Sequence, residues 1–362
     1  MSENLYFRRQ GLNSMIGGVS VLEAPRLSVR DIDQAHDFIK TYGYEWDNET
    51  DQKVILSYFR QAIAFLQDKF AGENFSVTDL FGKNDIEDAR HLLVAASDRE
   101  SDNKELQKWA CATLKVMHIL AHLNNDLYSI FDDEIREQIL SPIQKFVVED
   151  SIQGATLLQS ENHKIKLNKF EFKPVKNQSS GIIKLLSKRK LVALNILDRI
   201  GVRFVTKNTF DIFQVLRFLV NNSLVSYPHC IVNESVNTVY PTNLFLDTMD
   251  TLRAKSSKAN SKEISEILDK KLIELGDKAE FQNKENVFTD PDYKFIKFIS
   301  RKLIRIEVER KGKKEMVQFF YPFEVQIMGY ETYLKNMRGP LSHDEYKGRQ
   351  EKAAKLRLFG EA

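Results

Sequence analysis

The chain has 362 residues, 42% of them apolar, which allows a sizeable core and about two domains. Its 53 Lys and Arg against 51 Asp and Glu give a formal charge of +2, so no global field selects nucleic acid or a membrane. Cys111 and Cys230 lie far apart, and no apolar run reaches the roughly 20 residues of a membrane span. These features exclude a disulfide framework and favour a cytoplasmic protein.

The amino-terminal part of the chain is predicted to be helical. Residues 1–14 contain Glu3 to Phe7 and Gln10-Gly11, which resemble a protease-site tag, so we treat them as tag-like or disordered. Ser28 followed by Asp31 resembles a helix-capping start. We therefore expect an all-helical domain over residues 15–150. Apolar residues recur at helical spacing over 29–42, 51–70, 85–96, 104–123 and 133–148.

His118 and His122 stand one turn apart on one predicted helix. This spacing can bind zinc, but no third ligand follows at a recognised distance. We expect packing or a surface role for this pair.

The pattern then changes to alternation, and we place a domain boundary near residue 150. Strands are expected over 164–172, 200–205 and 229–233, with a helix over 206–222. A polar, lysine-rich stretch at about 243–292 looks like an insertion that carries a helix over 263–275. We expect this insertion to be a surface or partner element.

The remaining sequence predicts more strands and one last helix. Residues 151–362 are therefore expected to form a mixed sheet flanked by helices, and the whole chain to be α+β. The expected strands lie at 303–308, 316–321 and 323–328, a turn at 311–313 and a helix at 342–358.

Asp198 stands at the entrance to the strand 200–205, and Arg203 lies inside that apolar run. A carboxylate and a guanidinium held at the edge of a sheet suit metal and phosphate binding, because the sheet fixes their geometry. The alternative is an ion pair that closes the end of the strand.

The most basic segment of the chain runs from Lys173 to Lys207. Lys176, Ser180, Lys184 and Arg189 lie in it, and its Ser179-Ser180-Gly181 stretch is expected to be a loop whose amides cradle a polyphosphate. A solvated basic helix and an RNA-binding surface are the alternatives.

Glu324 lies between Phe323 and Val325 in an apolar run, with Gln326 on the same face of the predicted strand. A buried acid must be paired, bound to a metal, or placed at an edge. Two carboxylates on separate strands, Asp198 and Glu324, can hold Mg²⁺ while basic groups bind phosphates.

These motifs resemble the RelA/SpoT-like synthetase domain, a nucleotidyltransferase-type family. The resemblance covers roughly residues 170–350 and rests on the order of its motifs. They are Lys176-Asn-Gln-Ser-Ser-Gly-Ile-Ile-Lys184, Asp198-Arg-Ile-Gly-Val-Arg203, Glu324-Val-Gln326-Ile327 and His343-Asp-Glu-Tyr346-Lys347.

The resemblance implies an enzyme that transfers pyrophosphate from ATP to the 3′-hydroxyl of a guanine nucleotide, with RNA as another acceptor. In that case Lys176 and Lys184 hold the donor triphosphate, and Asp198 and Glu324 bind Mg²⁺. Glu324 acting as the base for the acceptor hydroxyl is an alternative, and Arg203 steadies a phosphate or the Asp198 carboxylate.

Two segments are candidates for the aromatic residue that stacks on the acceptor base in this family. One contains Tyr240, and the other contains Tyr293 and Phe298. The alternative function is a catalytically degenerate regulator that binds a nucleotide or a protein partner through its helical domain.

Overall fold

The computed structural model describes a large part of the chain, and all structural statements below concern these residues. They are residues 27–71, 81, 87–98, 102–124, 130–150, 155–161, 163–173, 178–187, 197–282, 294–337 and 343–360.

The chain divides into two compact units, each built from separate stretches of sequence. Unit 1 comprises residues 1–129, 176–196 and 348–362, and unit 2 comprises residues 130–175 and 197–347. Unit 1 thus takes two segments from the range that we expected to form the second domain.

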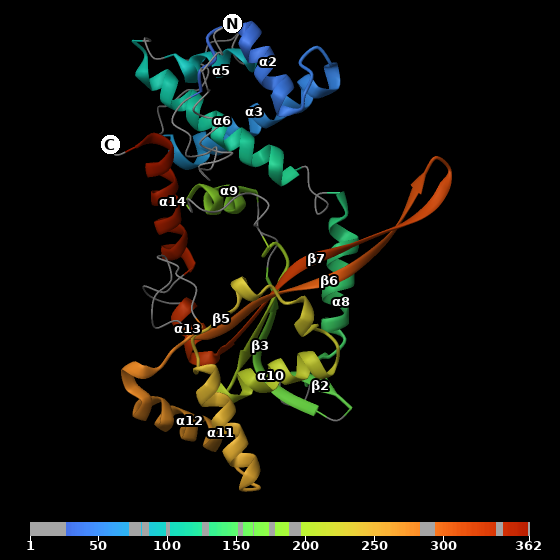
Figure 1. Cartoon of the computed structure of the whole chain (residues 1–362), viewed down its shortest axis with the longest axis vertical. Helices are drawn as coiled ribbons and strands as arrows, with labels where there is room; N and C mark the ends of the chain where they lie inside the picture. Colours follow the sequence, from blue (N-terminus) through green and yellow to red (C-terminus); the bar gives the residue numbers. More distant parts are fainter. Residues whose placement is uncertain are drawn as a thin grey trace, which may run out of the picture. The chain divides into compact units, whose positions relative to one another are not determined.

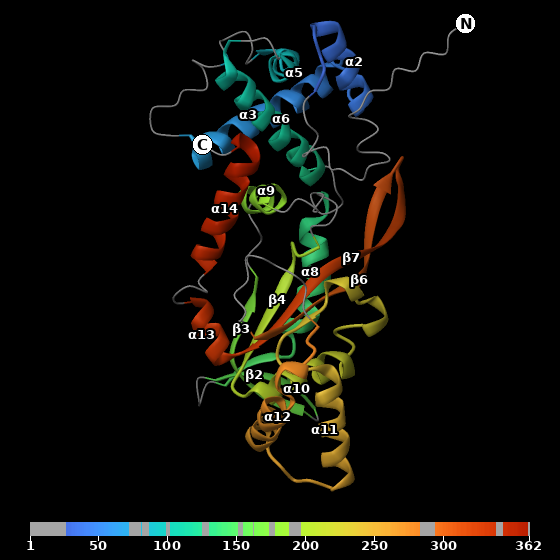
Figure 2. The same ribbon diagram turned by 60° about the vertical axis from the view of Figure 1, so that its left-hand side comes forward.

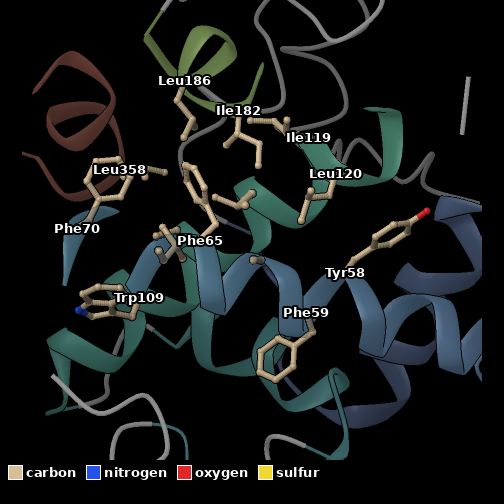
Figure 3. Packing of buried hydrophobic residues seen from close by; sticks show 14 of the residues in the cluster. Tyr58, Phe59, Phe65, Phe70, Trp109, Ile119, Leu120, Ile182, Leu186 and Leu358 are labelled. Atoms are coloured by element: carbon tan, nitrogen blue, oxygen red, sulfur yellow. The ribbon is translucent and has the colours of Figure 1, made fainter. Parts of the chain in front are cut away.

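Unit 1 is helical in the part that the structure describes. Its core packs α3 and α6 together with α9 and the carboxyl-terminal part of α14, as the side chains in Figure 3 show. Arg357 of α14 donates hydrogen bonds from Nη1 to the carbonyls of Leu185 and Leu186, which lie in the last turn of α9. The helices are α2 (Ile32–Tyr42), α3 (Glu49–Phe70), α5 (Arg90–Ser97), α6 (Lys104–Asn124), α9 (Gln178–Ser187) and α14 (His343–Phe359).

Unit 2 is built on a seven-stranded mixed sheet in the order β1-β2-β3-β4-β7-β6-β5. All neighbouring strands are antiparallel except β4 and β7, which are parallel. The prediction of an α+β protein with a mixed sheet is therefore confirmed. The strands are β1 (Val147–Asp150), β2 (Ala155–Ser160), β3 (His163–Phe172), β4 (Gly201–Thr206), β5 (Val236–Asn237), β6 (Phe295–Arg310) and β7 (Lys313–Gly329).

Helices accompany the sheet, and α10 packs against β3, β4 and β7. The helix pair α11 and α12 packs onto α10, with α12 alongside α10 and Phe245 of α11 stacked on Phe213 of α10 with centroids 3.8 Å apart. The described helices of unit 2 are α8 (Asp132–Gln144), α10 (Thr209–Asn221), α11 (Thr242–Ala254), α12 (Ser261–Leu275) and α13 (Tyr330–Met337).

The strands β6 and β7 extend past the other strands as a two-stranded ribbon (Figures 1 and 2). They are joined at Lys311 and Gly312, whose φ angles of 53° and 71° are those of a two-residue hairpin turn. The predicted turn is thus confirmed.

Several sequence predictions about single elements were wrong. The expected strand 229–233 forms parts of two short 3-10 turns, Tyr227–His229 and Val232–Glu234, and only Cys230 makes a β-bridge, to Ser300. Pro228 at the start of this segment has no backbone N–H to give to a sheet.

Two other corrections concern element boundaries. The helix expected to reach residue 148 ends at Gln144, and the next residues form β1. The strands expected at 316–321 and 323–328 are one strand, β7, which passes through Pro322. The N–H of Glu324 points toward β4, and by alternation the nitrogen of Pro322 points to the same side. The pairing with β4 begins only at Glu324, so Pro322 has no neighbouring strand on that side and no ladder hydrogen bond is lost.

Candidate functional site

A row of polar side chains crosses four strands of the sheet. Glu171 on β3 lies opposite Arg203 on β4, Arg203 lies opposite Gln326 on β7, and Gln326 lies opposite Lys297 on β6. Residues that lie opposite one another in a sheet project to the same face. The sheet therefore gathers these four side chains on one face.

Arg203 is the centre of this row. Its Nε donates to Oε1 of Gln326 at 3.1 Å, and its Nη1 lies 3.2 Å from Oε2 of Glu171. The Arg203 side chain is only partly exposed and Gln326 is 6% exposed, so both contacts are largely shielded from water. The guanidinium is thereby fixed in orientation.

Glu324 lies one row further along the same face and is 2% exposed. Its carboxylate forms an ion pair with Lys173 through Oε1, and its Oε2 lies 3.8 Å from Nζ of Lys297. Two ammonium groups, from Lys173 directly after β3 and from Lys297 on β6, thus compensate the charge of this buried acid.

Gly201 explains how Lys173 reaches Glu324. Gly201 lies opposite Glu324, and its carbonyl accepts a hydrogen bond of 2.8 Å from the N–H of Lys173. A Cβ atom at position 201 would lie 2.8 Å from Cδ of Lys173. The missing side chain therefore leaves the space through which the lysine chain crosses β4.

Lys169 and Tyr333 complete the arrangement. Glu171 Oε1 accepts hydrogen bonds from Nζ of Lys169 at 2.5 Å and from the hydroxyl of Tyr333 at 3.2 Å. Burial alone would raise the pKa of Glu171, but the hydrogen bond from Lys169 and the charge of Arg203 outweigh it and hold that pKa below its ordinary value. Tyr333 ties α13 to the sheet at this point.

We call these eight residues the charged cluster. Four cationic side chains surround two carboxylates, so the cluster has an excess of positive charge. An arginine in fixed orientation among lysines suits the binding of phosphate groups. The cluster consists of Lys169, Glu171, Lys173, Arg203, Lys297, Glu324, Gln326 and Tyr333.

The structure thus brings together three of the residues predicted from sequence, namely Arg203, Glu324 and Gln326. The ion-pair partner seen for Arg203 is Glu171, which the sequence did not suggest. Asp198 is half-buried and lies three residues before β4. Because the N–H of Glu324 donates to the carbonyl of Ile200 at 2.9 Å, Asp198 approaches the sheet at the end that Glu324 adjoins.

The predicted phosphate-binding loop has a different structure. Ser180 and Lys184 lie in the helix α9, so the expectation of a loop at Ser179-Ser180-Gly181 was wrong. Ile182 and Leu186 of this helix belong to the apolar core of unit 1, which favours the helix over a loop (Figure 3). Lys176 and Arg189 lie outside the described residues, as do the side chains of His343 and Tyr346.

Tyr240 is part of the core of unit 2. It is 1% exposed, its ring stacks near Phe213 with centroids 6.0 Å apart, and its hydroxyl donates to Asp269 at 2.6 Å. Burial and then the Asp269 carboxylate raise the pKa of Tyr240. A ring enclosed in this way offers no face to a base, so Tyr240 is not part of the candidate site. Tyr293 lies outside the described residues, and Phe298 is buried on β6.

The histidine pair of unit 1 has a packing role. The Tyr42 hydroxyl and Nδ1 of His118 are 2.5 Å apart, and the His118 and His122 rings meet edge to face at 4.5 Å. Burial, with a smaller effect of His122, lowers the pKa of His118 to about 4. Within the described parts of the chain, no three His, Cys, Asp or Glu side chains gather as metal ligands.

The sequence contained a signal for some residues of the charged cluster that we missed. Lys169 and Glu171 on β3 and Lys173 directly after it follow one another at a spacing of two, which in an extended chain places all three on one face. Lys297 interrupts an apolar run between Ile296 and Phe298, as Glu324 does in its own strand.

Comparisons with known proteins identify no family for this chain, so its class is described by its fold and its candidate site. No protein-family model matches the chain, and a search of curated proteins finds no similar sequence. None of the helices described here is long and apolar enough to span a membrane. The class established by the geometry is a mixed α+β protein with a cluster of cationic and acidic side chains on one face of its sheet.

Proposed function

We propose that unit 2 is a RelA/SpoT-like nucleotidyltransferase-type domain that transfers pyrophosphate from ATP to a guanine nucleotide or to an RNA 3′-hydroxyl. The observation that carries this proposal is the meeting of Arg203 with Gln326 at 3.1 Å, beside Glu324. These residues come from the two motifs of the resemblance that lie far apart in sequence. The proposed site requires the two motifs to lie side by side, and they do so on the neighbouring parallel strands β4 and β7.

The charged cluster supports the phosphate-binding part of the proposal. Arg203 is oriented by Glu171 and Gln326, so its guanidinium needs little further ordering to bind a phosphate. Lys173 and Lys297 add two ammonium groups within reach of the same face. Such groups compensate the charge of an oligophosphate and stabilise charge that develops during transfer.

The donor set also fits Mg²⁺ in part. Asp198 and Glu324 would hold the ion, which binds proteins through one or two carboxylates and completes its shell with phosphates and water. Bound there, Mg²⁺ would supply charge neutralisation at the transferred phosphates. Glu324 is engaged by Lys173 and Lys297, so it must exchange an ammonium contact before it can bind a cation or accept the proton of a hydroxyl.

A second candidate function is a non-catalytic regulator that binds a nucleotide or a protein partner. The observation that favours it is the burial of Tyr240, which removes one of the two candidates for base stacking. The lysine contacts of the Glu324 carboxylate also favour the regulator, because they compensate the charge of this acid without a metal.

The two functions are separated by measuring ATP binding and turnover on the same samples. We expect calorimetry to detect ATP binding with Mg²⁺, and chromatography to detect pyrophosphate transfer to GDP, GTP or an RNA 3′ end. Asp198→Asn and Glu324→Gln should each lower turnover by more than about tenfold to a hundredfold, which is the effect of losing only an outer-shell partner of a metal ligand. Asp277→Asn and Glu274→Gln, which change exposed acids of the same unit, serve as matched controls.

The outcomes distinguish the proposals clearly. ATP binding without any product identifies the regulator. Turnover that survives both Asp198→Asn and Glu324→Gln shows that the assigned acids are wrong. A chain that does not bind ATP excludes the pyrophosphate transfer and a regulator that binds ATP.

A further inference from the structure

The strands β6 and β7 form a long two-stranded ribbon. Its paired residues run without interruption from Arg301 opposite Pro322 to Arg310 opposite Lys313. Ten residues per strand correspond to about 30 Å of extended chain. The ribbon leaves the rest of the sheet in both views (Figures 1 and 2).

One face of the ribbon is covered within unit 2. Ile304 and Ile306 are buried, and the Phe319 ring lies 6.4 Å from the ring of Phe131, next to α8. Gln138 of α8 also bonds the backbone of β6. Around Ile304 and Ile306 this face is therefore part of the core and is not available to a partner.

The opposite face is open to solvent along much of its length, and we call it the open ribbon face. By the alternation of side chains it continues the face that carries Lys297 and Glu324. It consists of Arg301, Leu303, Arg305, Glu307 and Glu309 on β6 and of Pro322, Phe320, Gln318, Met316 and Lys314 on β7.

Phe320 is the most informative residue of this face. It is a phenyl ring with 46% exposure, the Arg301 guanidinium lies 5.6 Å from its centroid, and the His229 ring meets it edge-on at 4.7 Å. Tyr227, two residues before His229, is 76% exposed. An exposed aromatic ring beside a guanidinium is an arrangement on which nucleic-acid bases stack.

The charge of the ribbon indicates the same type of partner. Basic residues outnumber acidic ones, and the acid nearest the centre of the open face, Glu307, is paired with Lys314 at 2.7 Å. On the open ribbon face these are Arg301, Arg305 and Lys314 against Glu307 and Glu309, whereas Lys302, Arg310, Lys313 and Glu315 lie on the opposite face and Lys311 lies in the turn.

A protein and a nucleic acid are the two kinds of partner that an exposed face with aromatic and basic side chains could bind. Lys, Glu and Asp are depleted at protein interfaces, whereas the open ribbon face carries Glu307, Glu309 and Lys314. A duplex hides the faces of its bases, but a single strand offers bases for stacking and phosphates for arginine. The open ribbon face fits a single strand best.

We propose that the open ribbon face binds single-stranded nucleic acid, with a base stacked on Phe320 and backbone phosphates at Arg301 and Arg305. This inference requires no turnover, so it stands or falls independently of the proposed pyrophosphate transfer.

The test is fluorescence anisotropy with the full chain and a labelled oligouridylate of about twelve nucleotides, a length within the usual site sizes. Phe320→Leu should weaken binding by about tenfold, the value of one base–aromatic stack, and leave the salt dependence unchanged. Arg301→Gln and Arg305→Gln should each reduce the slope of log affinity against log salt by about 0.7. Arg253→Gln and Lys262→Gln remove the same charge from exposed positions of unit 2 and should have little effect.

A thermal melt equal to that of the wild type shows that each variant is folded. The proposal is overturned if the wild-type chain does not bind the oligonucleotide at low salt, or if the control variants weaken binding as much as the ribbon variants. Equal affinity for a duplex of the same length would also contradict it. Binding that depends on Phe320 but not on salt would indicate an apolar peptide surface instead.

Discussion

Glu171 organises the charged cluster at the level of single residues. Its carboxylate contacts Lys169, Arg203 and Tyr333, so three elements of unit 2 meet at one side chain. Removing the acid leaves two cations without their shared partner. Glu171 therefore contributes both to stability and to the orientation of Arg203.

We predict that Glu171→Gln lowers the free energy of unfolding by about 1–3 kcal/mol at pH 7, the usual value for hydrogen bonds to charged groups. The native pKa of Glu171 lies below its ordinary value of 4.5, so the contribution is complete above pH 4.5 and is lost as the pH falls through the lower native pKa. Urea unfolding of both proteins at several pH values measures this difference.

The control is Glu266→Gln, which breaks an exposed ion pair on α12 and should change stability by no more than about 0.5 kcal/mol. A difference between wild type and Glu171→Gln that grows toward acid pH would contradict the assigned direction of the pKa shift.

Sequence reasoning succeeded for side chains whose position in a strand already made them unusual. Arg203 and Glu324 stand out because each interrupts an apolar run. The register that places Gln326 beside Arg203 depends on the pairing of β4 with β7, strands separated by more than a hundred residues. A period of two identifies a face but cannot identify the neighbouring strand.

At the level of elements, a side chain of α8 covers the edge of the ribbon. Gln138 donates from Nε2 to the carbonyl of Arg305 at 2.8 Å and accepts from the N–H of Arg305 at 3.1 Å. The side-chain amide thus replaces a missing neighbouring strand at the edge of β6. Edge strands left without such cover pair readily with other chains.

Gln138→Leu should release both backbone groups of Arg305 to water. We expect faster hydrogen exchange of the Arg305 amide. The free energy of unfolding should fall by about 1–3 kcal/mol, because two hydrogen bonds of about 0.5–1.5 kcal/mol each are removed. Exchange measured by NMR tests this directly. Glu137→Leu, at the exposed neighbouring position of α8, should leave the amide of Arg305 unchanged, and equal protection in both variants would refute the role of Gln138.

Helices with a regular apolar stripe were predicted well, and α3 and α12 begin and end close to the expected residues. The helix α11 was missed because its sequence, Thr242 to Ala254, is rich in polar residues and only Thr248 is buried. Its contact with α10 through Phe245 stabilises the helix, and a tertiary contact of this kind has no local periodic signal.

At the level of the whole molecule, α9 lies in a different unit from the strands on either side of it in sequence. The chain leaves unit 2 after Lys173 and returns before Gly201, and these two residues are hydrogen-bonded to each other. Between them, Ile182 and Leu186 fill the core of unit 1. A single domain boundary near residue 150 cannot describe this arrangement, because the later segments 176–196 and 348–362 also belong to unit 1.

We predict that Leu186→Ala destabilises unit 1 by about 2–5 kcal/mol, as the truncation of a fully buried leucine does. Thermal unfolding followed by Trp109 fluorescence reports on this unit, since Trp109 belongs to the same core. Leu356→Ala, at a half-exposed position of α14, should cost much less. Equal effects of the two substitutions would show that α9 does not support the unit.

The three-part composition of unit 1 also has a consequence for how the protein is made. Its helices up to Asn124 emerge from the ribosome early, but Leu186 and Leu358, which close the same core, emerge much later. At about 5–20 residues per second, the interval before Leu358 appears is on the order of ten seconds or more. During synthesis the apolar faces of the early helices therefore remain incompletely covered, and a nascent chain of this design is expected to depend on chaperones.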